Sequence, residues 1–432
     1  MLVATHLFAG WFAGHNNHLH GLARYPKDWM KILHTADWHL GDRLGRIDRT
    51  ADLRAAVGRV SKYCDSEAID VLLVAGDLFS ELARPDGLRE AIHHWQELFR
   101  PFLERGGTIL TLTGNHDNEN FCQTLVHAMT LAAPTVGTHG EEIPTGRLYL
   151  ATEPTFVRLG GVQFVLMPWP TPGRYFRGQT HLQYGSPEEK NEKLVDAWKA
   201  ALVAIRESPN YDRSAPAVLG AHINIFGGEI GGGLFRITPQ EDVVLKTHDL
   251  ANQFDYVALG HLHKAHAVGA PHVRYSGSIE RLDLGEAGDR KSVTVVEVGA
   301  GGLVGEPYTL PLPDTAPIFE THVLNPNVDL PQLRAKHSTP CTALVNLHIR
   351  YTAGEHHLED VLRELDEIFP RWYARDWEET GALGPTLVAE ELRSKSFRET
   401  VREYLEQELI QHDDADRDSI LALAEKLLDE AE

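Results

Sequence analysis

Residues 108–117 read TILTLTGNHD, an apolar run that ends at a glycine and is followed by an amide, an imidazole and a carboxylate. A short, continuous apolar run bounded by glycine is typical of a buried strand. Binding groups in open α/β sheets gather where strands end, so Asn115, His116 and Asp117 are candidate site residues. Standing alone, the stretch is explained equally well as a polar turn, because Gly-Asn is ordinary turn chemistry.

The same construction recurs at four other places in the chain. Each apolar run ends in side chains that could bind a ligand: residues 32–35 lead to Asp37 and His39, residues 70–75 to Asp77, residues 217–220 to His222, and residues 256–259 to His261 and His263. Side chains two residues apart on an extended segment point the same way. Each Asp-x-His or His-x-His pair can therefore reach one point. The alternative for a lone Asp-x-His is a capping aspartate beside an unrelated histidine.

Segments whose apolar residues have helical spacing lie between these runs, and this alternation predicts the fold. Apolar residues at positions 53, 56, 57 and 60 indicate a helix over about 48–66, and a second helix is expected over about 85–103. Right-handed β-α-β crossovers place the strand ends on one edge of a sheet. Residues 145–170 alternate like a second, more antiparallel layer, and residues 273–312 read as closing strands. We therefore predict an α/β fold, a two-layered β-sandwich flanked by helices.

Length and composition indicate that the chain has several domains. A chain of 432 residues is expected to hold two or more domains. The Pro-rich stretch 311–317 ends a domain over 30–312 and leads to a small α+β module over 317–385, with helices predicted over 391–432. Two apolar stripes in that tail, around Phe397 and Leu423, have helical spacing, for which core packing is the simpler explanation. Residues 1–29 show no sustained period and no secretory signal, so we predict a disordered extension or a misassigned start.

Charge and cysteine usage exclude several classes of protein. The net charge of −21 excludes nucleic-acid binding by bulk charge and favours cations, metal-held anions, local patches or a partner. Cys64, Cys122 and Cys341 lie far apart without CxxC spacing, which argues against a disulfide framework or zinc knuckle and fits a reducing compartment. No apolar stretch approaches the roughly 18 residues of a membrane span. A cytoplasmic protein without a membrane partner is expected.

The strand-end residues share one kind of chemistry. They are carboxylate, amide and imidazole groups with no thiolate, namely Asp37, His39, Asp77, Asn115, His116, His222, His261 and His263. Hard oxygen with imidazole suits Mn²⁺, Fe²⁺ or Zn²⁺. These donors are too many for one ion, whereas two ions about 3.5–4 Å apart with a bridging carboxylate would use them all. Such a pair produces hydroxide near neutral pH and neutralises charge on phosphorus.

Over residues 30–290, the ordered motifs Asp-x-His, Gly-Asp, Gly-Asn-His-Asp, a single His and Gly-His-x-His resemble the calcineurin-like metallophosphoesterase superfamily. Within it, HTADWHLG (34–41), GDLF (76–79) and GSIER (277–281) followed by Gly285-Glu286 resemble the SbcD exonuclease family. That family is the nuclease subunit of the SbcC–SbcD DNA-repair complex. The module and tail after residue 312 are similar in layout to its capping domain and partner-binding region.

The resemblance implies a role for each candidate residue. One ion would be held by Asp37, His39 and His263, the other by Asn115, His222 and His261, with Asp77 bridging the two. His116 would stabilise the transition state or protonate the leaving 3′-oxygen. Asp117 would orient His116 or, alternatively, cap the next helix.

The resemblance also implies an activity and partners. We expect an Mn²⁺-dependent DNA nuclease, a double-strand 3′–5′ exonuclease and a single-strand or hairpin endonuclease. It would act with an SbcC-type ATPase bound to residues 391–432, as a homodimer within a heterotetramer. Arg43, Arg46 and Arg49 are candidate phosphate contacts, unless they form only a solvated basic stretch. The alternatives are a small-molecule phosphodiesterase or phosphatase, and a metal-free scaffold that binds DNA or a partner.

Overall fold

The computed structural model describes residues 29–133, 140–176, 184–229, 243–313, 316–337 and 340–380, with residues 405, 409, 420–424 and 426 of the tail. The chain forms two compact units, residues 1–349 with 359–376 and residues 350–358 with 377–432. Except for Trp29, which begins the first strand, the predicted extension over 1–29 lies outside the described residues, as does most of the predicted helical tail. The division into four parts stays a prediction.

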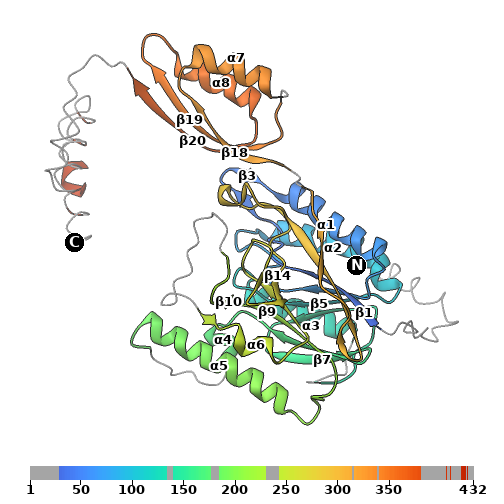
Figure 1. Cartoon of the computed structure of the whole chain (residues 1–432). Coiled ribbons are helices and arrows are strands. Elements are labelled where there is room, and N and C mark those ends of the chain that lie inside the picture. Colours follow the sequence, from blue (N-terminus) through green and yellow to red (C-terminus); the bar gives the residue numbers. More distant parts are fainter. Residues whose placement is uncertain are drawn as a thin grey trace, which may run out of the picture. The chain divides into compact units, whose positions relative to one another are not determined.

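The first sheet of the sandwich holds the N-terminal strands (Figure 1). Its parallel strands are β1 (Trp29–Thr35), β4 (Val71–Val74), β5 (Thr108–Leu112) and β6 (Leu148–Ala151). The antiparallel strand β15 (Ser292–Gly299) pairs with β1, and β16 (Gly302–Leu303) and β17 (Tyr308–Pro311) pair with β15. All residues of β4 and β5 are buried, as expected for parallel strands covered on both faces.

The second sheet is mostly parallel, which corrects one expectation. Its strand order is β13 (His266–Val268), β14 (Ala270–Tyr275), β12 (Tyr256–Gly260), β9 (Ala217–His222), β8 (Val162–Met167) and β7 (Thr155–Leu159). Only the pairs at its two edges, β13 with β14 and β7 with β8, are antiparallel. The expected antiparallel layer over residues 145–170 is wrong in part, because β6 joins the first sheet. Alternating polarity identifies a half-buried strand but not the strand beside which it lies.

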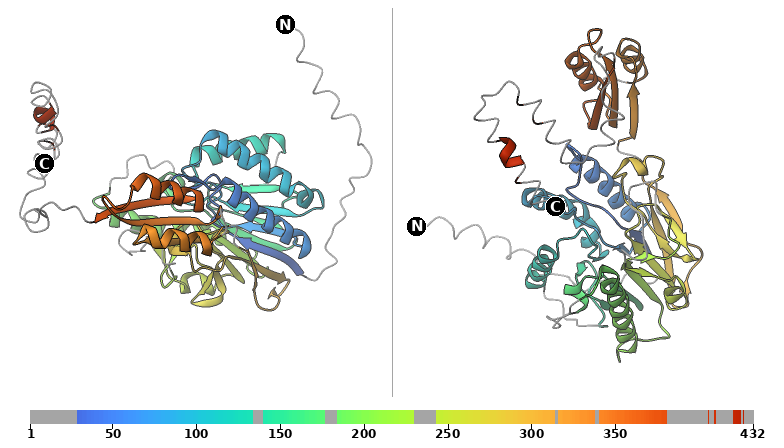
Figure 2. Two further views of the ribbon diagram at one scale, coloured as in Figure 1. Left: turned by 90° about the horizontal axis from the view of Figure 1, so that it is seen from above. Right: turned by 90° about the vertical axis from the view of Figure 1, so that its left-hand side faces the viewer.

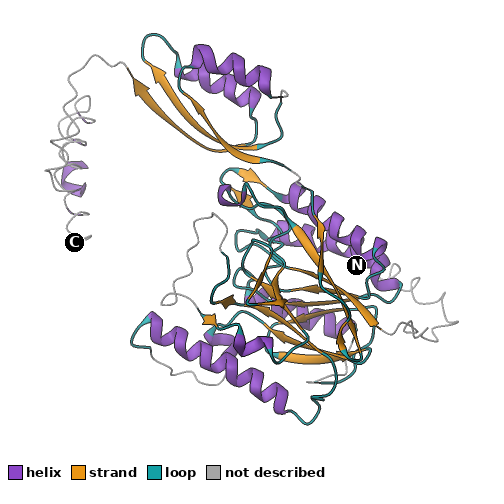
Figure 3. Cartoon of the chain, viewed as in Figure 1, coloured by secondary structure: helices purple, strands orange, loops and turns teal. Residues whose placement is uncertain are grey.

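Apolar residues from both sheets fill the space between them. Ile32, Leu73 and Leu110 of the first sheet form one buried cluster with Phe164 and Val218 of the second. The outer face of the first sheet packs on α1 (Thr50–Ser66), α2 (Pro85–Glu104) and α3 (Glu119–Ala132). The second sheet packs on α5 (Pro187–Glu207) and α6 (His248–Ala251), and a short helix α4 (Pro172–Tyr175) follows β8. The predicted two-layered sandwich flanked by helices is confirmed (Figures 2 and 3).

A third sheet follows the Pro-rich stretch. It has the order β18 (Ile318–Val323), β19 (Leu344–Thr352) and β20 (Trp372–Thr380), with α7 (Pro326–Lys336) and α8 (Leu358–Ile368) on one face. The mixture of strands and helices agrees with the α+β module predicted over 317–385. Helix α7 contains two prolines, Pro326 at its start and Pro331 inside it.

The remaining short elements lie in loops. They are β2 (Arg43–Leu44) with β3 (Ile47–Asp48), β10 (Asn224–Ile225) with β11 (Val244–Leu245), and the 3₁₀ turn η1 (Leu284–Glu286). All three cysteines are buried and unpaired, as their spacing predicted. Among the residues that the structure describes, every helix is too short or too polar to cross a membrane.

Candidate metal centre

The seven predicted metal ligands meet at the carboxyl ends of strands from both sheets. β1, β4 and β5 of the first sheet lead to Asp37, His39, Asp77 and Asn115, and β9 and β12 of the second lead to His222, His261 and His263. Every one of them lies against another member of the set through a hydrogen bond, an ion pair or close donor atoms. We call this group the strand-end centre.

The backbone at the strand-end centre is left-handed where the strands stop. Asp37, His39, Asp77 and His261 have φ values of +54°, +45°, +51° and +103°, and Ala68 is the fifth non-glycine residue with positive φ in the described part of the chain. Such conformations are unfavourable for residues with a Cβ atom and persist only where the surrounding structure holds them. Their concentration here shows that the fold holds these side chains in a defined arrangement.

Two glycines let the strand ends approach one another closely. A Cβ atom on Gly114 would lie 2.1 Å from Asp77 Oδ1, and one on Gly76, whose φ is +94°, would lie 2.3 Å from His222 Nδ1. Any side chain at either position would displace a predicted ligand. The glycines of the Gly-Asp and Gly-Asn pairs are thus required by the packing of the site.

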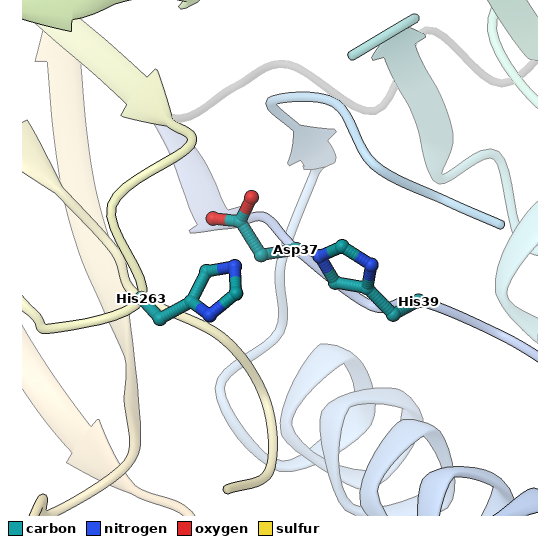
Figure 4. Close-up of side chains that lie close together, drawn as sticks. All are labelled: Asp37, His39 and His263. Carbon is teal, nitrogen blue, oxygen red and sulfur yellow. The ribbon is translucent and has the colours of Figure 1, made fainter. Parts of the chain in front are cut away.

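The first group of donors is Asp37, His39 and His263, whose ligand atoms lie within 4.8 Å of one another (Figure 4). His263 Nδ1 lies 2.7 Å from Glu286 Oε1. Because a carboxylate oxygen accepts, Nδ1 carries the proton and Nε2 is left as a donor to a metal. His39 Nε2 is buried and has no hydrogen-bond partner among the described residues. An ion is one of the partners that can satisfy a buried polar atom in this condition.

The second group is Asn115, His222 and His261. Asn115 Oδ1 lies 2.9 Å from both His222 Nε2 and His261 Nδ1. His222 Nδ1 donates to the carbonyl oxygen of Ala75 at 2.8 Å, which again directs the other ring nitrogen into the site.

Asp77 connects the two groups. Its Oδ2 atom lies 3.2 Å from His222 Nε2 in the second group and 3.6 Å from His39 Nε2 in the first. The carboxylate is buried, so water does not compete for it. Its position between the two groups is the one that the resemblance assigned to a bridging ligand.

Burial and neighbouring charges shift the pKa values of the donors in both directions. Burial alone would lower the pKa of His222 and His263, but the carboxylates of Asp77 and Glu286 raise it to about 9 in each case. Burial lowers the pKa of His39 to about 3, so its imidazole is neutral at physiological pH. Burial alone would raise the pKa of Asp77, but the charge and hydrogen bond of His222 bring it well below its usual range. Burial also raises the pKa of Asp37, to about 6. A cation would compensate the two buried carboxylates.

His116 lies at the solvent side of the centre. Its backbone N–H donates to Asp77 Oδ1 at 2.9 Å, and its ring centroid lies 5.0 Å from that of His39. Its side chain is 27% exposed, and Nδ1 lies 3.7 Å from Glu81 Oε2. The imidazole is therefore next to the ligands and can be reached by a substrate.

Asp117 differs from both sequence interpretations. Its carboxylate accepts hydrogen bonds from three backbone N–H groups, those of Leu78, Phe79 and Gly114, at 3.3, 2.9 and 2.8 Å. It ties the loop after β4 to the loop after β5 rather than orienting the His116 ring. The capping interpretation is wrong, because Asn118 caps α3 by accepting from Phe121 N.

Glu286 is a functional residue that local spacing did not reveal. It is buried, and besides His263 it accepts from Lys291 Nζ at 2.5 Å and from Ser278 Oγ at 3.1 Å. Burial would raise its pKa, but His263 and then Lys291 hold the pKa at about 2. The sequence offered Glu286 only as part of a family motif, since nothing in its own spacing relates it to His263.

Trp169 is a second residue that the sequence reasoning missed. Its ring stacks on His261, with centroids 4.7 Å apart and planes at 28°. The buried Arg174 donates to the carbonyl oxygens of Trp169 and Gly114 at 2.9 and 3.3 Å, which fixes this loop beside the centre. Trp169 comes two residues after β8, so the strand-end rule applied to this strand would have found it.

The three candidate phosphate-contacting arginines are mostly engaged elsewhere. Arg49 is buried and donates to Asp52 Oδ2 at 2.7 Å, so the expectation for it is wrong. Arg46 donates to two backbone carbonyl oxygens at the start of β20, those of Pro370 and Trp372, at 2.9 and 3.0 Å. Arg43 and Arg46 are both exposed, and the side chain of Arg43, which donates to the carbonyl oxygen of Arg46, is 42% exposed.

The donor set fits divalent metal ions. It consists of oxygen and imidazole groups without thiolate, four of them buried, with two histidines held in one tautomer and a buried nitrogen that has no hydrogen-bond partner among the described residues. These are the ligands of hard to borderline divalent ions, in contrast to Cu(I) or a thiolate zinc site.

The model of the family described as Calcineurin-like phosphoesterase matches residues 30–265. The chain belongs to this family, and it is a metal-dependent phosphodiesterase of the hydrolase class. The match spans every predicted ligand and the strands from β4 to β12, and it ends before β13.

Relatives of known name indicate to which group within this family the chain is similar. The SbcD component of the nuclease SbcCD of Staphylococcus epidermidis is 26% identical over 353 residues, which are 79% of this chain and 83% of the relative. The proteins of the same name from Bacillus subtilis and Rhodobacter capsulatus are 28% and 29% identical, over 63% and 67% of this chain and 67% and 71% of the relatives. These relatives confirm the resemblance to the SbcD family.

Proposed function

We propose that this chain is an Mn²⁺-dependent DNA nuclease, a double-strand 3′–5′ exonuclease and single-strand or hairpin endonuclease that works with an SbcC-type ATPase. The observation that carries the proposal is the position of Asp77 Oδ2 between the two donor groups, 3.2 Å from His222 Nε2 and 3.6 Å from His39 Nε2. Relatives named as components of a nuclease support nucleic acid as the substrate.

The donors would hold two ions. Asp37, His39 and His263 would bind one, Asn115, His222 and His261 the other, and Asp77 both. A donor set of oxygen atoms and imidazole nitrogens suits Mn²⁺. When bound, such a pair supplies hydroxide near neutral pH and neutralises charge on the phosphate.

The chain's own groups would do the rest of the chemistry. Glu286 and the Ala75 carbonyl hold the Nδ1 protons of His263 and His222, so these rings keep their Nε2 atoms directed into the centre. His116 is the partly exposed imidazole beside the ligands, so it would stabilise the transition state or give a proton to the leaving 3′-oxygen.

DNA binding would need a partner. The net charge is −21, and each of the three candidate arginines donates a hydrogen bond within the protein. The tail over 391–432 would bind the ATPase. Among its described residues, the apolar side chains of Ile420 and Leu423 are 40% and 57% exposed, which supports a docking role. The assembly would be a homodimer within a heterotetramer.

A cleavage assay on end-labelled duplex and hairpin DNA tests the proposal, with Mn²⁺, Mg²⁺ or chelator. We expect Mn²⁺-dependent cleavage that is lost in His116→Ala and kept in the control His248→Ala, which changes an exposed histidine on α6. Cleavage of small phosphoesters alone would favour a small-molecule phosphodiesterase, and no cleavage with any metal would favour a scaffold.

A further inference from the structure

The third sheet carries a second cluster of potential metal ligands, on the face opposite α7 and α8. Glu320 and His322 lie two residues apart on β18, and Asn346 and His348 lie two residues apart on β19. In the parallel register, Glu320 pairs with Asn346 and His322 pairs with His348. All four side chains therefore project from the same face of the sheet.

Three of these residues bring their donor atoms together. One ligand atom from each of Glu320, His322 and His348 lies within 4.8 Å of the others. His348 Nε2 lies 3.6 Å from Glu320 Oε2, and His322 Nε2 lies 3.9 Å from Glu320 Oε1. The two imidazole rings are stacked, with centroids 4.7 Å apart. Ligand atoms about 2.0–2.2 Å from a tetrahedral zinc ion are separated by about 3.4 Å, so small side-chain movements would complete the site.

The orientation of His348 is already that of a metal ligand. Its Nδ1 atom lies 2.8 Å from Asp376 Oδ2 on β20, so Nδ1–H donates to the carboxylate. The remaining nitrogen, Nε2, accepts from Asn346 Nδ2 at 3.0 Å and lies 3.6 Å from Glu320 Oε2, so a bound ion would take the place of the Asn346 hydrogen bond. A carboxylate that fixes the ring of a ligating histidine in this way is a regular feature of zinc sites.

We propose that Glu320, His322 and His348 form a separate zinc site on the third sheet, with Asp376 as the positioning residue of His348. Two imidazoles and one carboxylate are the ligand set of zinc sites that keep a fourth position open to water. The site is distinct from the strand-end centre, since it lies on other strands and in another module of the chain. Its occupant would tie the edge strand β18 to the central strand β19.

Zinc-binding stoichiometry of the full-length protein tests this proposal. The chain is stripped with chelator and titrated with Zn²⁺ by calorimetry, and bound metal is counted by mass spectrometry. The double variant His322→Ala/His348→Ala should bind one Zn²⁺ fewer per chain than the unchanged protein. The control His248→Ala removes an exposed histidine that lies 3.3 Å from a single carboxylate, that of Asp249, and should bind the full number. An equal number of zinc ions in the double variant would overturn the proposal.

Two conservative variants keep the test decisive if the double variant folds poorly. Glu320→Gln should abolish binding at this site alone, and Asp376→Asn should weaken it by about tenfold to a hundredfold. Both side chains are at least half exposed, so neither change should lower the unfolding temperature of the metal-free protein. Cobalt gives a second readout, because the absorption of tetrahedral Co²⁺ should disappear in Glu320→Gln. Unchanged zinc affinity and cobalt absorption in both variants would contradict the site.

Discussion

The strand-end centre and the cluster on the third sheet share one sequence pattern and differ in their surroundings. Both use side chains two residues apart, Asp37 with His39 in one and Glu320 with His322 in the other. In the strand-end centre, Asp37, His39, Asp77 and His222 are buried, and three of these four have left-handed backbone. On the third sheet they stay within regular strands, and the side chains of Glu320 and His322 are 50% and 56% exposed.

The difference shows what burial contributes. Exposed donors are satisfied by water when no ion is bound, whereas buried carboxylates and imidazoles are not. The strand-end centre is therefore expected to bind its ions tightly and to depend on them, while the cluster on the third sheet should exchange its ion readily. Variants in the two places should have effects of very different size on catalysis.

Removal of the bridging carboxylate should have the largest effect. Asp77→Ala takes away a buried carboxylate that lies between the two donor groups. Loss of the several kcal/mol contributed by metal catalysis corresponds to at least about a thousandfold lower cleavage rate. Cleavage kinetics and metal counts on the same sample measure this. A variant that keeps two ions and its nuclease rate would refute the bridging role, and Glu320→Gln on the third sheet should leave the rate unchanged.

The next effect should come from His116. His116→Ala removes a partly exposed imidazole while leaving every predicted ligand in place. Loss of a general acid typically lowers the rate by about 10²–10⁴-fold, so cleavage should fall by this factor while metal affinity stays the same. Single-turnover cleavage at saturating Mn²⁺, with calorimetric Mn²⁺ binding, separates the two quantities. Weaker metal binding as the cause of a lower rate would place His116 among the ligands instead.

The carboxylates that orient histidines offer a direct comparison between the two places. Glu286→Gln removes the acceptor of His263 Nδ1–H, as Asp376→Asn does for His348. Each should weaken metal binding at its own site by about 10–100-fold. Only Glu286→Gln should affect cleavage, and high Mn²⁺ should restore the rate. If excess Mn²⁺ fails to restore it, Glu286 acts in catalysis rather than in positioning.

A smaller effect is expected at Trp169. An aromatic stack is worth about 0.5–1.5 kcal/mol, so Trp169→Ala should lower apparent Mn²⁺ affinity by about two- to tenfold by freeing the His261 ring. Trp169→Phe keeps an aromatic face and serves as the matched control. The Mn²⁺ concentration at half-maximal cleavage is the measurement, and equal losses in both variants would show that stacking is not the cause.

Deletion of residues 391–432 should have the smallest effect on chemistry. The strand-end centre lies wholly within residues 37–286, so cleavage of short oligonucleotides should continue at the rate of the full chain. Co-purification with an SbcC-type ATPase should be lost. Retained co-purification would move the docking surface away from the tail.

The sequence alone predicted that most side chains of the strand-end centre would meet, as the structure shows, while their role as metal ligands stays a prediction. Each ligand comes at or just after a buried run with a recognisable local pattern, as Asn115 follows β5 and His222 ends β9. Parallel strands bring such ends to one edge, so local information and the chirality of crossovers predicted the convergence. The β-sandwich could be predicted for the same reason, because the apolar periodicities of helices and strands can be read from short stretches of sequence.

The tertiary structure alone decided which side chains meet without a shared local pattern. Glu286 reaches His263 through a loop, Asp117 turns to the backbone of another strand end, and Arg49 is buried beside Asp52. The same holds for the register that sets His322 beside His348. The local repeat of apolar and polar residues determines on which face of a strand or helix a side chain lies. The residue that this side chain contacts depends on how distant segments pack, and no short stretch of sequence contains that information.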